Sequence, residues 1–229
     1  MNSHDVRREW ATRRGEFSPE YYAYYGPDGT SEAVRELVAR FVGRDATVLE
    51  VGCSSGRHLA HLHEAGFTDL HGVEINDEAV ATMAETYPDL AADVTVHVDA
   101  VENVVRTFDD GQFDAVYSVE TLQHIHPDDA WVFGDLARVT DDLLVTVEHE
   151  GHDEGATDAN AKDDDGATDA GGAGAGPAGS GATGVNYVDE DLPLYYRNWR
   201  RVFTGHGLVE VAHESRERDT LRAFRTPPR

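Results

Sequence analysis

Short apolar runs alternate with longer segments of helical periodicity along most of the chain. The apolar runs at residues 47–51, 70–75, 94–98, 113–119 and 143–148 have the length of buried strands. The segments between them repeat apolar residues at the spacing of amphipathic helices. Alternating units of this kind imply a parallel sheet that helices cover on both faces, so we expect an α/β, doubly wound fold.

Capping residues and glycines predict where the helices begin and end. Asn76 precedes two acids at a predicted helix start, Pro88 stops that same helix, and Gly66 follows the last turn of the helix before it. Two late runs, 208–214 and 220–225, are expected to pair as a hairpin. The predicted helices cover residues 31–41, 56–66, 77–87, 128–140 and 191–206.

One segment interrupts this alternation. Residues 151–184 contain 10 Gly and 9 Ala among 34 residues and no aromatic side chain. Because such a composition buries little apolar surface, we expect a disordered acidic insert there, most simply a tolerated surface insertion. The chain is then predicted to comprise an aromatic-rich amino-terminal segment or lid (1–30), a ligand-binding core (31–150), the insert, and a carboxyl-terminal helix and hairpin (185–229) that complete the core.

The charge is strongly acidic, with 44 Asp and Glu against 19 Lys and Arg and a formal net charge of −25. Only one of the bases is a lysine, Lys162. This composition resembles that of proteins from extreme halophiles. In about 1 M salt the screening length is about 3 Å, so the negative charge does not exclude nucleic acid as a partner.

The single cysteine, Cys53, cannot form an intrachain disulfide, so nothing in the cysteine usage indicates an oxidising compartment. No apolar run reaches the roughly 18 residues of a membrane span, and the first residues contain no apolar core of a signal peptide. We therefore expect a cytoplasmic protein with no membrane association.

A glycine-rich turn follows the first predicted strand, in the sequence VLEVGCSSG at 48–56. Small residues at Gly52, Ser54 and Gly56 allow the backbone to approach a ligand at the carboxyl edge of the sheet. The second strand ends near Glu74, where a carboxylate can accept hydrogen bonds from ribose hydroxyls. Together these features predict a site for an adenosine-containing ligand.

Two details argue against a dinucleotide. The dinucleotide fingerprint would need glycines at 52, 54 and 57, where this chain has Gly52, Ser54 and Arg57. Glu50 also faces the turn, and its charge would repel a pyrophosphate. A nicotinamide-dependent oxidoreductase is therefore disfavoured, and a cationic ligand such as S-adenosylmethionine suits the acid better.

At these positions the chain resembles the class I S-adenosylmethionine-dependent methyltransferases. The acid and glycines of that family's first motif match Glu50, Gly52 and Gly56, whereas Ser54 replaces the middle glycine. The resemblance implies S-adenosylmethionine as cofactor and a Rossmann-like, mostly parallel seven-stranded sheet with an antiparallel carboxyl-terminal hairpin. The cofactor-binding residues that it implies are Glu50, Gly52, Cys53, Ser54, Gly56, Glu74, Ile75, Asp99, Ala100 and Val119.

Each of these residues also has a purely structural interpretation. The glycines are what a tight strand–helix turn needs, and Glu74 and Asp99 are acids in an acid-rich chain. Cys53 is more simply explained as a small buried residue of the turn than as a nucleophile. Arg57 fits either a contact to the ligand carboxylate or a solvated position at a helix start.

Methyl transfer from a sulfonium needs alignment of the acceptor, and it needs a base only when the nucleophile holds its proton tightly. Four side chains near the carboxyl edge are candidates for such a base: His124, Glu120, Glu148 and His149. The histidines also occur at spacings that metal ligands use, as at 58, 61 and 63 or at 124 and 126. With 12 histidines such spacings arise by chance, and we predict no metal site.

Two aromatic segments, EYYAYYG at 20–26 and LPLYYRNW at 192–199, lie outside the predicted core. They are expected either to wall an acceptor pocket or to form a lid without substrate contact. No Asn/Asp/Ser-Pro-Pro-aromatic motif and no RNA-binding module is present, so a small-molecule acceptor is the leading hypothesis. The alternatives are a non-catalytic cofactor-binding regulator of the same fold and an RNA or protein methyltransferase; the sequence leaves the oligomeric state open.

Overall fold

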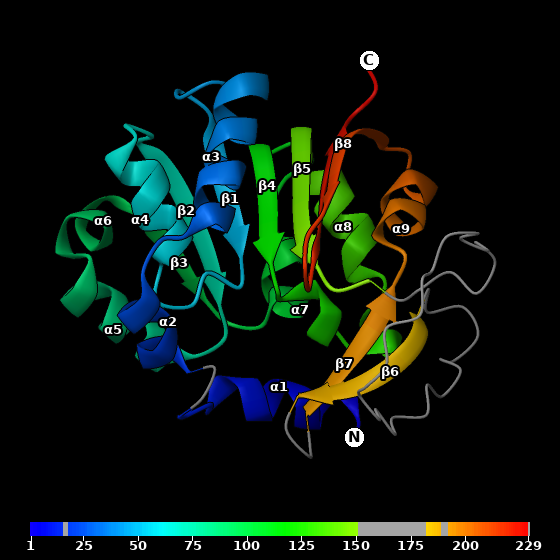
Figure 1. Ribbon diagram of the computed structural model, residues 1–229, viewed down its shortest axis with the longest axis horizontal. Coiled ribbons are helices and arrows are strands. Elements are labelled where there is room, and N and C mark those ends of the chain that lie inside the picture. Colours follow the sequence, from blue (N-terminus) through cyan, green and yellow to red (C-terminus); the bar gives the residue numbers. More distant parts are fainter. Residues whose placement is uncertain (16–17, 151–181, 189–191, 229) are drawn as a thin grey trace, which may run out of the picture.

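A seven-stranded sheet forms the centre of the protein, which we describe from a computed structural model (Figure 1). The structure describes residues 1–15, 18–150, 182–188 and 192–228. The strand order is β3-β2-β1-β4-β5-β9-β8, and β9 runs antiparallel to both of its neighbours. The strands are β1 (Thr47–Val51), β2 (Asp69–Glu74), β3 (Thr95–Val98), β4 (Phe113–Val119), β5 (Thr140–Glu148), β8 (Val209–Ser215) and β9 (Thr220–Arg225).

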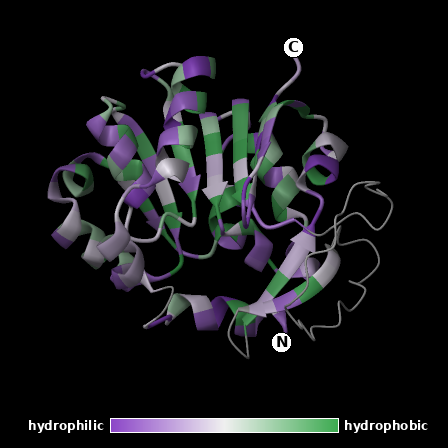
Figure 2. Cartoon of the chain, viewed as in Figure 1, coloured by the Kyte–Doolittle hydropathy of each residue, from purple (hydrophilic) through white to green (hydrophobic). Residues whose placement is uncertain are grey.

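Helices cover both faces of this sheet and enclose two apolar cores. One core packs α3 (Gly29–Phe41), α4 (Arg57–Glu64), α5 (Asp77–Thr86) and α6 (Pro88–Asp93) against the sheet. The opposite core packs α7 (Val101–Val104), α8 (Val132–Val139) and α9 (Trp199–Gly205). Apolar residues accordingly concentrate on the central strands in Figure 2. The predicted doubly wound fold with its antiparallel terminal hairpin is confirmed.

Two additions lie beyond the carboxyl ends of the parallel strands, at the bottom of the view in Figure 1. One is the amino-terminal pair of helices, α1 (Ser3–Ala11) and α2 (Pro19–Tyr25). The other is a two-stranded antiparallel ribbon of β6 (Ala182–Val188) and β7 (Leu192–Arg197). Helix α1 contacts β7, so the two additions meet below the sheet.

The helix predicted over 191–206 is wrong in its first half. Residues 192–197 form β7, and only 199–205 are helical, with Asn198 as the N-cap whose side chain accepts from Arg201 N. Over so short a run, the apolar residues fit both the spacing of a helix and the alternation of a strand. Pairing with β6 makes this segment a strand.

The predicted insert 151–184 also overlaps this ribbon. Its last three residues belong to β6, and residues 151–181 lie outside the described part of the chain. Across the described ranges, no helix combines the length and the apolar character that a membrane span needs.

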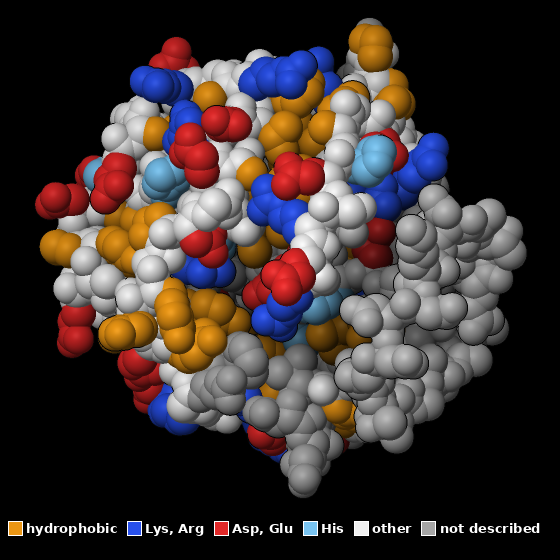
Figure 3. All heavy atoms as spheres, in the orientation of Figure 1, with side chains coloured by type: hydrophobic (Ala, Val, Ile, Leu, Met, Phe, Trp, Pro, Cys, Tyr) orange, Lys and Arg blue, Asp and Glu red, His pale blue; other side chains and the backbone are white. Residues whose placement is uncertain are grey.

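Arginine and acidic side chains are interspersed on the molecular face drawn in Figure 3. Many of the arginines are paired with neighbouring acids. Arg225, for example, donates from Nε and Nη2 to both carboxylate oxygens of Asp142, each at 2.7 Å. Arg222 lies between Glu150 and Glu210. Since the chain has more than two acids for each base, such pairing leaves an excess of acids.

Candidate functional site

The turn after β1 has three residues in the left-handed backbone region: Gly52 (φ 74°), Ser54 (φ 47°) and Gly56 (φ 80°). These angles let the chain reverse at the end of β1, and the Gly52 N–H donates to Val73 O of β2 at 2.9 Å. A side chain at Gly52 would collide with Thr121, whereas one at Gly56 would meet side chains of α5 and α6. The turn is thereby held against both neighbouring elements.

Glu50 is the most deeply buried acid of this turn, with 1% of its surface exposed. The hydroxyl of Tyr117 donates to Glu50 Oε2 at 2.9 Å. Burial raises the pKa of Glu50 to about 8 despite this hydrogen bond. The free protein therefore holds a proton on Glu50 at neutral pH, and a cationic ligand would favour its release.

Glu74 ties the turn to the end of β2. Its Oε2 accepts from Ser54 N at 2.7 Å and its Oε1 accepts from Asn76 N at 2.8 Å. Burial raises the pKa of Glu74. Asp99, beyond the end of β3, is exposed and accepts from Ala100 N and Asn103 Nδ2 through Oδ1, so Oδ2 remains available to a ligand.

These strand ends border one pocket, whose roof is formed by α1 and α2. Gly56 does not line it, because that glycine faces α5 and α6. Cys53 is buried, and burial raises the pKa of its thiol well above the usual range, so it is a poor nucleophile. The predicted cofactor-binding residues that line the pocket are Glu50, Gly52, Cys53, Ser54, Glu74, Ile75, Asp99, Ala100 and Val119.

The roof includes residues that the sequence did not single out. Val6 and Trp10 of α1 line the pocket one helical turn apart, and Arg7 and Arg13 lie beside them. A signal existed, since Asn2 caps the helix and Val6 and Trp10 form an i, i+4 apolar pair.

The aromatic segments contribute less to this pocket than expected. Of the tyrosines in 20–26, only Tyr22 lines it, while Tyr24 and Tyr25 are 85% and 61% exposed. In the second segment Trp199 is fully buried in the core, and Tyr195 packs its ring against His126 at a centroid distance of 5.6 Å. Among the aromatic side chains of these two segments, only Tyr22 therefore contributes to the wall of this pocket.

Among the four base candidates, His124 has the clearest position. Its ring packs on the Trp10 ring at a centroid distance of 4.5 Å, and its Nδ1 lies 3.3 Å from Pro193 O of β7. Burial lowers the pKa of His124 to about 4, so the imidazole is neutral at physiological pH. This histidine lines the pocket and is held by both additions.

Glu148 does not reach the pocket. Its carboxylate accepts from the Ser118 hydroxyl at 2.8 Å and from the backbone N–H groups of residues 121–123 at 3.1 to 3.3 Å. Burial raises its pKa to about 8. Glu148 therefore positions the loop after β4, and it makes no contact with the pocket as a base would.

Glu120 and His149 flank a smaller hollow beside the main pocket, which shares Trp10, Tyr22 and His124 with it. Glu120 has a left-handed backbone (φ 49°), unusual for a residue with a side chain. Burial and the charge of Asp219 raise the pKa of Glu120, and burial lowers the pKa of His149.

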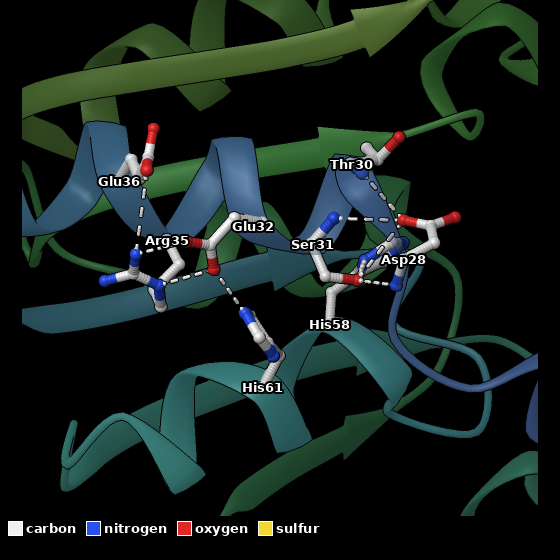
Figure 4. A network of polar contacts seen from close by, with 8 residues as sticks. All are labelled: Asp28, Thr30, Ser31, Glu32, Arg35, Glu36, His58 and His61. Atoms are coloured by element: carbon white, nitrogen blue, oxygen red, sulfur yellow. Dashed lines mark hydrogen bonds and ion pairs between the residues drawn. The ribbon is translucent and has the colours of Figure 1, made fainter.

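The histidines of α4 have separate polar partners. The Nδ1 of His58 lies 2.7 Å from the Ser31 hydroxyl, inside the capping box that Asp28 forms at the start of α3 (Figure 4). His61 pairs with Glu32, which lies on α3 as Ser31 does, again at 2.7 Å (Figure 4). These contacts give His58 and His61 polar partners on α3, and His58 also lines the main pocket.

The helix-start residue Arg57 is only 14% exposed, so it is not the solvated arginine that one interpretation expected, while a contact to a ligand carboxylate stays a prediction. It lines the pocket, and it also pairs with Asp28 at 3.2 Å and lies over the Tyr22 ring at 5.1 Å. Arg57 thus links α2, α3 and the glycine turn at the pocket edge.

Comparisons with known proteins agree with this geometry. Residues 48–142 match the family model of a methyltransferase domain. A curated relative, the O-antigen chain terminator bifunctional methyltransferase/kinase of Escherichia coli, is 30% identical over 91 residues, which is 38% of this chain and 12% of the relative. The chain thus matches about an eighth of that relative's length.

Two solved structures share the fold over nearly the whole chain. Magnesium protoporphyrin IX methyltransferase from Synechocystis, crystallised with SAH, has a TM-score of 0.62 at 12% identity and covers 99% of this chain and 100% of its own. Geranyl diphosphate C-methyltransferase from Streptomyces coelicolor has a TM-score of 0.60 at 12% identity and covers 98% of each chain. These likenesses show the fold of the described chain.

Proposed function

We propose that this chain, which carries a class I S-adenosylmethionine-dependent methyltransferase domain, transfers the cofactor's methyl group to a small organic acceptor. One observation carries the choice of acceptor. The pocket at the carboxyl edge of the sheet is roofed by α1 and α2, so that Trp10 and Tyr22 lie over the strand ends. A concave pocket whose surface is mostly apolar and which two helices partly cover suits a small molecule better than a polymer.

The positions of the acids support one orientation of S-adenosylmethionine. Glu74 is placed to accept from the ribose hydroxyls, and Asp99 lies where the resemblance puts the adenine amino group. The methionine portion would then lie beside Gly52 and Val119, with its positive charges near Glu50. In this pose the sulfonium methyl group would face the packed rings of Trp10 and His124.

The transfer itself is an in-line displacement at the methyl carbon. The acceptor's electron pair forms the new bond while the bond from carbon to sulfur breaks and its electrons stay on sulfur, which leaves as a neutral thioether. The leaving group needs no proton, so the protein acts mainly by aligning the acceptor and excluding water. Neutral His124 can take a proton from the acceptor where the nucleophile carries one.

Binding of S-adenosylhomocysteine, measured by titration calorimetry, tests the cofactor assignment. We expect Glu74→Ala to weaken binding by about 1–3 kcal/mol, because it removes a charged acceptor for the ribose hydroxyls and frees two backbone N–H groups. Glu85→Ala, an exposed acid on α5, is the matched control and should bind as the wild type does. Equal affinity of both variants would remove Glu74 from the site.

A screen with isotopically labelled S-adenosylmethionine tests the acceptor class. Label should enter small organic compounds and not RNA or protein. Label found only in a polymer would overturn the small-molecule assignment while leaving the cofactor site intact.

The pKa of Glu50, about 8 in the free protein, predicts a pH-dependent affinity for S-adenosylmethionine. The sulfonium and ammonium groups of the methionine portion favour ionised Glu50, so binding releases a proton below pH 8. The affinity should therefore rise with pH, by at most tenfold per unit, and level off above pH 8. Calorimetry in buffers of different ionisation enthalpy measures this proton release. Glu50→Gln should bind more weakly and lose the slope; an unchanged slope in Glu50→Gln would assign the proton elsewhere.

A further inference from the structure

Three side chains with metal-binding chemistry meet beside the acceptor end of the pocket. Glu120 follows β4, His149 follows β5, and Asp219 lies in the turn between β8 and β9. Each offers one ligand atom, and these atoms all lie within 4.8 Å of one another. They come from segments far apart in the sequence, so the fold itself brings them together.

Among the described residues no arginine or lysine forms an ion pair with either carboxylate, although the positive charge of Arg218 acts on both and Arg218 also lines the smaller hollow. His149 contacts Asp219, with its Nε2 3.4 Å from Asp219 Oδ1. That oxygen is shielded from solvent and accepts no hydrogen bond in good geometry. One carboxylate oxygen of Glu120 lies within 4.8 Å of one of Asp219. Two carboxylates in such contact need either a shared proton or a cation.

The backbone holds all three positions independently of their side chains. Glu120 N donates to Val147 O at 2.8 Å, and Asp219 O accepts from Arg216 N at 2.8 Å. His149 N donates to Gln123 Oε1 at 2.8 Å, and His149 O accepts from the Trp199 indole at 2.9 Å. Ligands on fixed backbone are the preorganisation that a metal site requires.

We propose that Glu120, His149 and Asp219 bind one divalent cation of the first transition series. Two carboxylate oxygens and one imidazole nitrogen suit Mn²⁺, Fe²⁺, Co²⁺ or Zn²⁺ better than Ca²⁺, which prefers oxygen ligands alone. This proposal departs from the expectation from sequence of no metal site, which rested on patterns of histidines, cysteines and acids close together in the chain.

Three protein ligands leave further coordination positions open. Glu120 lines both the main pocket and the smaller hollow, so the open positions would face the space assigned to the acceptor. A cation there can hold an acceptor oxygen and lower the pKa of its hydroxyl. This consequence, an oxygen-bearing acceptor, rests on the proposed function; the cation site does not.

Titration of the full chain with Mn²⁺, followed by electron paramagnetic resonance, tests the site directly. We expect one bound Mn²⁺ per chain in the wild type and at least about tenfold weaker binding in Asp219→Asn and in Glu120→Gln. Asp93→Asn is the matched control, because it removes the acid of a surface histidine pair, His63–Asp93 at 2.9 Å. Its Mn²⁺ affinity should equal that of the wild type.

Two outcomes would overturn the proposal. One is wild-type binding of Mn²⁺ and Zn²⁺ no tighter than that of Asp219→Asn, which would leave a shared proton between the carboxyls. The other is an equal loss of affinity in Asp93→Asn. Asp219 does not line the main pocket, so Asp219→Asn should bind S-adenosylhomocysteine as the wild type does, and that measurement also checks that the variant is folded. Failure of wild-type S-adenosylhomocysteine binding would instead count against the proposed function.

Discussion

Arg197→Ala is expected to lower the free energy of unfolding by about 3–5 kcal/mol. The Arg197 side chain, on β7, has no exposed surface and lies over the ring of Phe133 at 5.0 Å. Its Nη2 donates to Ile125 O at 2.6 Å and its Nη1 donates to Leu122 O at 3.3 Å. Alanine would leave a cavity and two buried carbonyl groups without their charged donor.

The same substitution should disturb the site, because the loop after β4 is held from both sides. Glu148 accepts from its N–H groups, and Arg197 donates to its carbonyl groups. His124 lies within this loop and packs on Trp10. We therefore expect a fall in turnover that exceeds any loss of cofactor affinity, since the glycine turn and Glu74 are not in this contact.

Denaturant unfolding together with a methyl-transfer assay measures both effects. Arg200→Ala, two-thirds exposed on the neighbouring helix, is the control and should cost less than about 1 kcal/mol. Arg197→Met keeps much of the volume but no donor, so it separates packing from hydrogen bonding. A loss below about 1 kcal/mol in Arg197→Ala would show that the carbonyl groups find other donors.

The central sheet was predictable because each strand is a short apolar run that ends at a turn or cap. The strands at 47–51 and 113–119 have the predicted bounds, since burial on both faces leaves an unbroken apolar signal. The ribbon strand at 192–197 was not predictable, because one short run of Leu and Tyr fits both the helical and the strand period. Only pairing with its partner strand distinguishes the two. The partner strand, β6, directly follows the Gly- and Ala-rich segment 151–181, so the local pattern around 192–197 does not reveal it.

The residues of the candidate site likewise fall into two groups: those that the local sequence predicts and those that only the folded chain brings together. Glu50 and Glu74 were predictable from their distance to the glycine turn, which the local strand–turn–helix geometry fixes. Trp10 was not singled out, because its place over the pocket depends on where α1 lies on the finished fold. Asp219 was not found either, since its meeting with Glu120 and His149 requires the terminal hairpin to pair with β5.

Gly52→Ala is expected to abolish measurable cofactor binding, with a loss of at least about 100-fold, and to destabilise the fold by about 2–4 kcal/mol. The backbone at Gly52 has φ 74°, a conformation that costs an alanine about 1–2 kcal/mol. The new Cβ would also lie 2.2 Å from Thr121 Oγ1 and 2.5 Å from Thr121 Cγ2, well inside contact distance. The turn and the loop after β4 would have to separate at the point where the methionine portion is proposed to bind.

Gly66→Ala is the matched control, because Gly66 has φ 90° and open space around an added Cβ. It should show the backbone cost alone and bind S-adenosylhomocysteine as the wild type does; similar affinities for the two alanine variants would contradict the proposed pose. Adding Thr121→Ala to Gly52→Ala removes the Oγ1 and Cγ2 contacts but leaves the Thr121 Cβ only 2.8 Å away. The double variant should therefore recover stability in part and binding little, because the two segments still cannot close on each other.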